Sequence, residues 1–127
     1  MLKHIKKLNY RQQEAVEHPS GPLLIAAGAG SGKTQTLTSR IAHLLASGIA
    51  PQHILAITFT NKAAEEMRSR IFQGQMSKVN SQMLFIGTFH SFGARLLHAE
   101  AHRCGRKTNF TIFDEDDAFS VVKNILK

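Results

Sequence analysis

Blocks of apolar residues alternate with helical patterns along this chain, and the blocks predict parallel strands. Residues 54–59 form a continuous apolar run, as expected for a strand covered on both faces of a sheet. Similar runs occupy residues 23–26 and 83–87, and residues 110–113 are a short fourth candidate. Strands that alternate with helices favour right-handed crossovers and a parallel sheet. The pattern therefore predicts an α/β fold.

Apolar residues at helical spacing predict helices around these strands. The first spans residues 9–18, where Asn9 and Gln12 have the spacing of a capping box. The others are predicted at residues 33–47, 61–72 and 90–102, and from residue 114 to the last residue. Residues 74–82 are polar and predict a loop. The last helical pattern stops without a cap, glycine or proline, which is typical of a truncated sequence.

The composition allows one modest hydrophobic core, since the chain has 127 residues of which 43% are hydrophobic. No apolar stretch reaches the roughly 20 residues that span a bilayer, so no membrane partner is expected. The basic start is not followed by the apolar segment of a signal peptide. A single cysteine, Cys104, excludes an internal disulfide framework and a cysteine-based zinc cluster. These features predict a reducing, cytoplasmic location.

The charge makes nucleic acid the first candidate partner. The net charge is +7, which suits a polyanion, although charge alone does not identify one. Residues 58–62 and 88–91 lie where strands are expected to end, the edge at which α/β sheets place ligands. Phe59 can stack on a base, and the neighbouring hydroxyl and amide groups can bind phosphates or sugars.

A structural interpretation of the same residues stays open. Spacing alone favours Phe59 as a core residue and Asn61 as a helix N-cap. Lys62 can neutralise a phosphate or extend into solvent. His90 by itself is more typical of a structural histidine than of a ligand.

The run from Leu23 to Thr34 carries the most specific chemistry, because a strand pattern leads into a glycine-rich loop that ends in Gly32-Lys33-Thr34. Glycines allow successive backbone N–H groups to turn inward and surround a polyphosphate. Lys33 would then reach the β- and γ-phosphates as the catalytic cation, and the Thr34 hydroxyl would ligate Mg²⁺. The helix that follows adds the positive end of its dipole. The chain is therefore predicted to bind a nucleoside triphosphate.

The predicted nucleotide ligands extend beyond the loop to Gln12. Its carboxamide can both donate to and accept from an adenine edge, although it can also serve only to complete the capping box. Both roles can coexist. The predicted ligands are Gln12, Ala27, Gly28, Ala29, Gly30, Ser31, Gly32, Lys33, Thr34 and Gln35.

Four ordered motifs carry a resemblance to a known family. They are Leu-Asn-Tyr-Arg-Gln-Gln-Glu-Ala-Val at residues 8–16, the loop at 27–34, Thr-Phe-Thr-Asn-Lys-Ala-Ala-Glu-Glu-Met at 58–67 and Gly-Thr-Phe-His-Ser at 87–91. In kind and order they resemble the N-terminal part of UvrD/Rep-type DNA helicases, superfamily 1 motors that move 3′ to 5′ on single-stranded DNA. The resemblance covers nearly the whole chain.

This resemblance implies a P-loop NTPase (RecA-like) parallel sheet flanked by helices, incomplete in this chain. Residues 1–110 would belong to the first motor domain and residues 111–127 to an inserted helical subdomain. ATP and Mg²⁺ are the implied cofactors. Single-stranded DNA or DNA junctions, and the second motor domain of the same helicase, are the implied partners. The implied DNA contacts are Thr58, Phe59, Thr60, Asn61, Lys62, Thr88, Phe89 and His90.

Some residues depart from the family pattern or invite another interpretation. Ala27 stands where the usual loop has glycine, and Gln35 where many relatives have an arginine. Residues 110–115 have the form of a strand that ends in a metal-binding Asp-Glu pair. The resemblance instead places them at the start of the inserted subdomain, where Asp114 or Asp116 would cap a helix.

The expected function is therefore that of an ATP-driven DNA translocase and helicase in the intact protein. The resemblance implies that the acidic metal motif and the arginines that support hydrolysis lie outside these residues. The chain alone is expected to bind nucleotide, and DNA weakly, without hydrolysing ATP or unwinding DNA. The alternative is a short non-catalytic module that binds nucleotide or DNA for regulation. The pathway stays open among repair, replication restart and plasmid replication.

Overall fold

The computed structural model describes residues 8–72, 83–112 and 115–126. The chain divides into two units, Met1–Thr88 and Phe89–Lys127. The first contains α1 (Tyr10–Glu17), α2 (Lys33–Ala46), the 3₁₀ helix η2 (Pro51–His53), β1 (Leu55–Thr58), α3 (Asn61–Phe72) and β2 (Phe85–Thr88). The second contains α4 (Phe89–Glu100), the 3₁₀ helix η3 (Ala101–Cys104) and α5 (Glu115–Ile125). The predicted loop at residues 74–82 lies outside the described residues.

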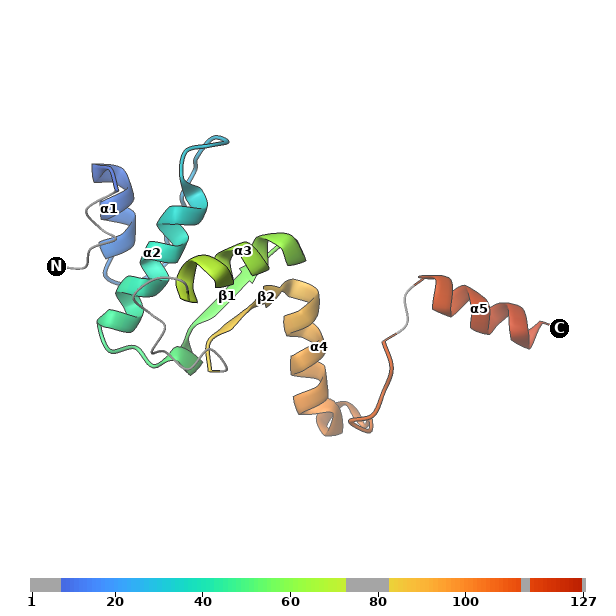
Figure 1. Ribbon diagram of the computed structural model, residues 1–127. Helices are drawn as coiled ribbons and strands as arrows, with labels where there is room; N and C mark the ends of the chain where they lie inside the picture. The colour runs from blue at the N-terminus through green and yellow to red at the C-terminus, as the bar shows by residue number, and fades with distance from the viewer. Residues whose placement is uncertain (1–7, 73–82, 113–114, 127) are drawn as a thin grey trace. The chain divides into compact units, whose positions relative to one another are not determined.

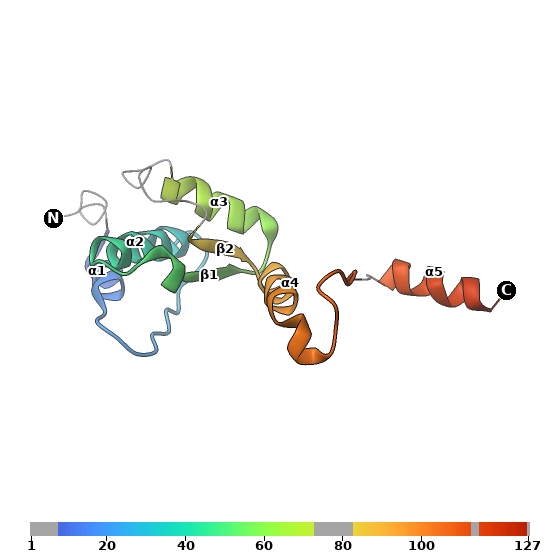
Figure 2. The same ribbon diagram turned by 90° about the horizontal axis from the view of Figure 1, so that it is seen from below.

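A β–α–β arrangement forms the centre of the first unit. Strands β1 and β2 are parallel, with Leu55 opposite Phe85 and Thr58 opposite Thr88. Parallel neighbours need a crossover connection, and α3 lies in that connection, packed against both strands (Figures 1 and 2). The strands predicted at residues 54–59 and 83–87 and the helix predicted at residues 61–72 are thereby confirmed.

One hydrophobic core joins α2, α3 and the two strands. The inward face of α3 carries Ala64, Met67 and Ile71 at helical spacing, and all three are buried. The core consists of Ile41, Ile54, Ala56, Ala64, Met67, Ile71, Leu84 and Ile86. The sheet was expected to be covered on both faces, and this is wrong for β1. Ala56 and Thr58 are buried, whereas Leu55 on the other face is 47% exposed.

Two predicted strands are absent from the described residues. Residues 23–26 have no regular secondary structure and pair with neither β1 nor β2, and Leu24 is 93% exposed. A strand exists through hydrogen bonds to a neighbouring strand, so an apolar sequence without such a partner does not become one. Residues 110–112 likewise form no strand, and the Phe110 ring stacks on the His98 ring with centroids 4.3 Å apart.

Helix α1 is held at both of its ends. The capping box is confirmed, because the Asn9 side chain accepts from the Gln12 N–H and the Gln12 side chain accepts from the Asn9 N–H. At the other end, Arg40 of α2 donates to the Val16 carbonyl oxygen at 2.6 Å. Val16 is fully buried and forms a small apolar cluster with Leu8.

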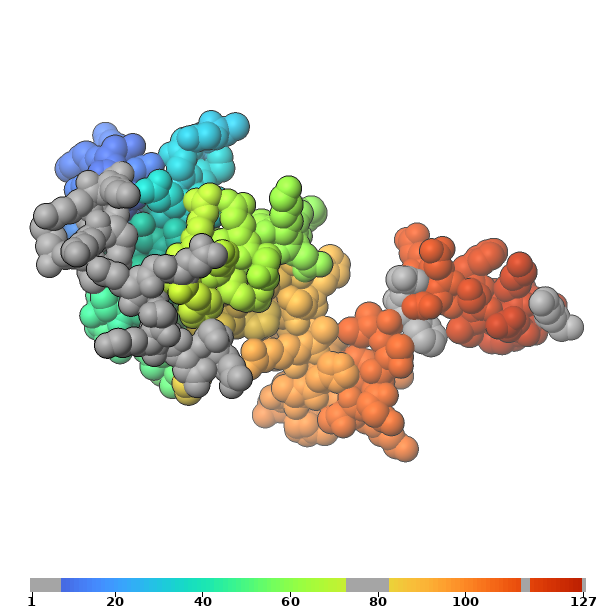
Figure 3. Space-filling view, in the orientation of Figure 1, coloured from blue at the N-terminus to red at the C-terminus, as the bar shows by residue number. Residues whose placement is uncertain are grey.

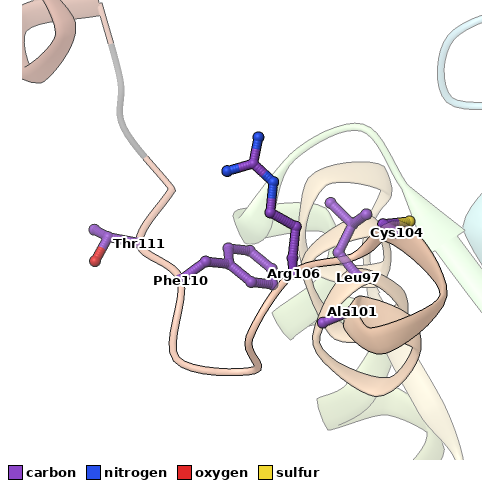
Figure 4. Close-up of a pocket in the computed structure, with 6 residues that line it drawn as sticks. All are labelled: Leu97, Ala101, Cys104, Arg106, Phe110 and Thr111. Atoms are coloured by element: carbon purple, nitrogen blue, oxygen red, sulfur yellow. The ribbon is translucent and has the colours of Figure 1, made fainter.

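The second unit contains a helix followed by a turn that folds back on it. Helix α4 ends at Glu100, and Gly105 closes η3 with a positive φ of 65°. A pocket of about 350 Å³ beside this turn is lined by Leu97, Ala101, Cys104, Arg106, Phe110 and Thr111 (Figure 4).

The last helix carries three acidic residues in the first turn that the structure describes. Helix α5 starts at Glu115, so Asp116 lies inside its first turn and is not its N-cap, while Asp114 falls outside the described residues. Acidic residues in a first turn interact favourably with the helix dipole, so these carboxylates have a structural explanation. Within the described residues, no helix combines the length and the apolar character needed to cross a membrane.

Candidate nucleotide-binding site

The glycine-rich loop forms a tight turn that leads directly into α2. The Ser31 N–H donates to the Gly28 carbonyl oxygen at 3.4 Å, which closes a turn over Ala29 and Gly30. Gly30 has a φ of 73°, as the third residue of a type II turn requires. Gly32 follows with a φ of 86° and is the N-cap of α2. The loop extends from the N-terminal end of α2 and lies at the surface of the first unit (Figures 1 and 3).

Lys33 folds its side chain back onto the loop. Its ammonium group donates to the carbonyl oxygens of Ala27 and Gly28 at 3.0 and 2.6 Å. The Ser31 hydroxyl donates to the same Gly28 oxygen at 2.7 Å. The loop therefore positions a cation and a hydroxyl over one short stretch of backbone, next to the N-terminus of a helix.

Gln12 connects α1 to this loop. Its Oε1 accepts from the Asn9 N–H at 2.9 Å, and its Nε2 donates to the Ser31 carbonyl oxygen at 3.0 Å. A Cβ atom added to Gly32 would lie 2.7 Å from the Gln12 Nε2. The capping-box interpretation of Gln12 is therefore confirmed but incomplete, because the same amide also contacts the loop.

Two pockets border Lys33. One of about 260 Å³ lies beside the loop and is lined by Asn9, Arg11, Gln12, Ala15, Ile25, Ala26, Ala27, Ser31, Lys33 and Thr36. The other, of about 210 Å³, is lined by Leu23, Ile25, Lys33 and Leu37. Four of the predicted ligands thus come together around the first pocket. Thr34 and Gln35 follow Lys33 in the first turn of α2 and are half-buried.

The sequence prediction missed Asn9 as part of this site, having treated it only as a helix cap. Its backbone N–H is one of the two groups that hold the Gln12 amide. The capping-box spacing was the signal that could have indicated this contact, since a capping box includes a bond from its third residue back to the cap.

The residues after β1 present an exposed aromatic side chain. Phe59 is 89% exposed, so its interpretation as a core residue is wrong. The cap of α3 is Thr60, whose Oγ1 accepts from the Ala63 N–H at 3.1 Å. Asn61 is the first residue of the helix and not its cap, and both Asn61 and Lys62 are exposed. Thr58 is buried, and its hydroxyl donates to the Thr60 carbonyl oxygen at 2.9 Å.

The end of β2 places Thr88 opposite Thr58 in the sheet, and Thr88 is also buried. Phe89 and His90, which open α4 in the second unit, are exposed. Arg68 of α3 steadies the strand by donating to the Ile86 carbonyl oxygen at 2.6 Å, while its other nitrogen contacts Glu65. This contact joins residues 18 positions apart, and no local sequence pattern indicates it.

Within residues 8–72, 83–112 and 115–126, no group of three or more histidine, cysteine or acidic side chains could hold a metal ion. Glu115 opens α5 and follows no strand in the described residues. Residues 110–112 and Glu115, the described part of this segment, therefore do not form a strand that ends in a metal-binding acidic pair.

The first unit is an α/β unit whose glycine-rich loop leads directly into a helix, an arrangement typical of proteins that bind phosphate groups. Its sequence family is more specific. The chain belongs to the UvrD/REP helicase N-terminal domain family, which matches residues 8–127.

Two similar proteins are helicases by name. The chain is 50% identical over 124 residues to the ATP-dependent DNA helicase PcrA of Staphylococcus epidermidis and 48% identical to the protein of that name from Staphylococcus aureus. Each alignment covers 97% of this chain and 17% of the relative. The chain thus spans about one sixth of the length of the curated relatives that it matches.

Proposed function

We propose that this chain is the ATP-binding part of an ATP-dependent DNA helicase. The observation that carries the proposal is the position of Lys33, whose ammonium group lies on the glycine-rich loop at the start of α2. A helix N-terminus, backbone N–H groups and a fixed cation together favour the polyphosphate of a nucleotide. Membership of a helicase family supports ATP as that nucleotide and DNA as the partner.

Each predicted ligand has a role in this proposal. The backbone of residues 27–32 surrounds the phosphates, which fits a loop with positive φ at Gly30 and Gly32. Lys33 contacts the β- and γ-phosphates, and Gln12 contacts the adenine edge. Gln35, in the first turn of α2, is proposed to contact the phosphate groups. Mg²⁺, when bound, neutralises phosphate charge, and the Thr34 hydroxyl is the ligand that this chain provides for it.

DNA contact is proposed at the ends of the two strands and at the start of α4. The exposed Phe59 ring is suited to stack on an unpaired base. Exposed Lys62 and His90 are suited to contact phosphate groups. The full set is Thr58, Phe59, Thr60, Asn61, Lys62, Thr88, Phe89 and His90.

We also propose that the chain alone binds ATP without turning it over. Hydrolysis needs charge stabilisation at the γ-phosphate, worth about 10³- to 10⁵-fold in rate when an arginine provides it. In this proposal that arginine comes from a second motor domain, and the complete motor moves 3′ to 5′ on single-stranded DNA. Residues 1–110 form part of its first motor domain, and residues 111–127 begin an inserted helical subdomain.

Calorimetric titration with Mg²⁺ and a non-hydrolysable ATP analogue tests the nucleotide site. We expect the wild-type chain to bind and Lys33→Ala to lose binding, because the fixed cation is removed. Lys123→Ala is the matched control, since it removes an exposed lysine from α5. Equal binding by wild type and Lys33→Ala would contradict the site. Steady ATP turnover by the chain that Lys33→Ala abolishes would contradict the proposal that the chain alone is inactive.

Fluorescence anisotropy with a labelled oligothymidylate tests the DNA contact. Base–aromatic stacking is worth about 1–3 kcal/mol per base, so Phe59→Ala should weaken binding about fivefold or more. Phe119→Ala removes a similarly exposed ring from α5 and serves as the control. Equal losses in the two variants would argue against a specific role for Phe59.

A further inference from the structure

The Gln12 carboxamide has only one orientation that satisfies both of its neighbours. Its Oε1 faces an N–H donor, that of Asn9, and its Nε2 faces a carbonyl acceptor, that of Ser31. Exchanging the oxygen and the nitrogen would place donor against donor and acceptor against acceptor. The two backbone groups therefore fix which end of the amide donates and which accepts.

In this orientation, some donors and acceptors of the Gln12 amide remain without a partner in the loop or in α1. A carboxamide has two N–H donors and an oxygen with two lone pairs, and each neighbour uses one. One donor and one acceptor remain on the amide, which lines the pocket beside the loop. That pair complements the N7 acceptor and the N6 amino group of adenine. It does not complement guanine, which presents the two acceptors N7 and O6 along the same edge.

We infer that Asn9 is a positioning residue for base selection, and that it acts through its backbone N–H by holding Gln12 in the orientation that accepts adenine and rejects guanine. The inference rests on the proposed function, in which Gln12 contacts the base. A free amide could turn its NH₂ group toward either acceptor of guanine, so it would discriminate less. The Asn9 side chain has a separate role, because its Oδ1 caps α1 by accepting from the Gln12 N–H.

The backbone at residue 9 makes it possible to test these two roles separately. Asn9 has a φ of −73°, which lies within the range that proline adopts, about −65 ± 15°. Asn9→Pro therefore removes the N–H together with the cap while retaining the local φ. Asn9→Ala removes the same capping side chain but retains the N–H. The difference between the two variants isolates the bond from the Asn9 N–H to the Gln12 Oε1.

The readout is the ratio of GTP to ATP dissociation constants, measured by calorimetry with non-hydrolysable analogues of both nucleotides and Mg²⁺. A loosened loop or a frayed α1 would weaken both nucleotides alike and leave this ratio unchanged. Losing the amide orientation should instead reduce the ratio in Asn9→Pro by about three- to tenfold, the value of one hydrogen bond. Asn9→Ala should retain the wild-type ratio. Circular dichroism shows whether each variant keeps its helices.

Other outcomes would overturn the inference in distinguishable ways. An unchanged ratio in Asn9→Pro would show that the N–H does not govern base selection. Equal reductions in both variants would assign selection to the cap. If Lys33→Ala abolishes binding but the wild-type chain binds ATP and GTP equally well, this inference alone is overturned. If binding does not depend on Lys33, the proposed function is overturned as well.

If circular dichroism shows that Asn9→Pro has lost its helices, nuclear magnetic resonance of the wild-type chain tests the inference instead. We expect ATP, but not GTP, to shift the side-chain amide resonances of Gln12. Equal shifts with both nucleotides, or no shift with either, would overturn the inference.

Discussion

The substitution Gly32→Ala tests the close approach between the loop and α1. Gly32 has a φ of 86°, and a Cβ atom there would lie 2.7 Å from the Gln12 Nε2. Gly30 is a matched control, because its φ of 73° is also positive and a Cβ atom there would have no neighbour within 4 Å. Both substitutions force alanine into the left-handed region, but only Gly32→Ala also collides with Gln12.

The magnitude follows from these two contributions. The left-handed conformation costs a non-glycine residue about 1–2 kcal/mol. The clashing atom is the end of a flexible side chain, so Gln12 should turn away and lose its bonds to Asn9 and Ser31. These bonds are exposed to solvent, and their joint loss should cost about 1 kcal/mol. Gly30→Ala should therefore lower the free energy of unfolding by about 1–2 kcal/mol and Gly32→Ala by about 2–3 kcal/mol.

Urea denaturation followed by circular dichroism measures both losses, and a double-mutant cycle with Gln12→Ala isolates the contact. When Gln12 is already alanine, Gly32→Ala should cost no more than Gly30→Ala. The reasoning would be refuted if the two glycine variants lost equal free energy with Gln12 present. It would also be refuted if the excess loss in Gly32→Ala persisted in the Gln12→Ala background.

Two further predictions concern the elements behind the site, and urea denaturation measures both. Thr60→Ala should lower the free energy of unfolding by about 1 kcal/mol because α3 loses its cap, whereas Thr60→Ser retains the hydroxyl and should lose much less; equal losses would contradict the capping role. Ile86→Ala should cost about 2–5 kcal/mol and Ile86→Val about 0.5–1.5 kcal/mol, because Ile86 is 4% exposed within the core. A loss below 1 kcal/mol in Ile86→Ala would contradict a packed core at β2.

Elements with strong local signals could be predicted from the sequence. Helix α3 begins at the predicted residue, because its apolar positions have helical spacing, although its cap is Thr60 and not the predicted Asn61. The capping box of α1 follows from a four-residue pattern. Strands β1 and β2 are short apolar runs that pair with each other in parallel. In each case the deciding interactions lie within a few residues or in a single pairing.

Features that depend on distant partners could not be predicted in this way. Residues 23–26 have a strand composition, but hydrophobicity does not supply the neighbouring strand that makes a strand. The exposure of Phe59 depends on what surrounds the end of β1, which the sequence pattern does not reveal. The contact between Gln12 and Ser31 joins residues 19 positions apart, and no local rule links them.

The two connections of α1 explain how so short a helix persists and why the loop depends on it. A helix of eight residues is unstable by itself in water, so tertiary contacts must stabilise it. Gln12 joins its first turn to the Ser31 carbonyl, and Arg40 joins its last turn to α2. Since the loop leads directly into α2, the helix, the loop and α2 form a closed arrangement in which each part restrains the others. A substitution that weakens either connection should therefore destabilise α1 and loosen the loop together.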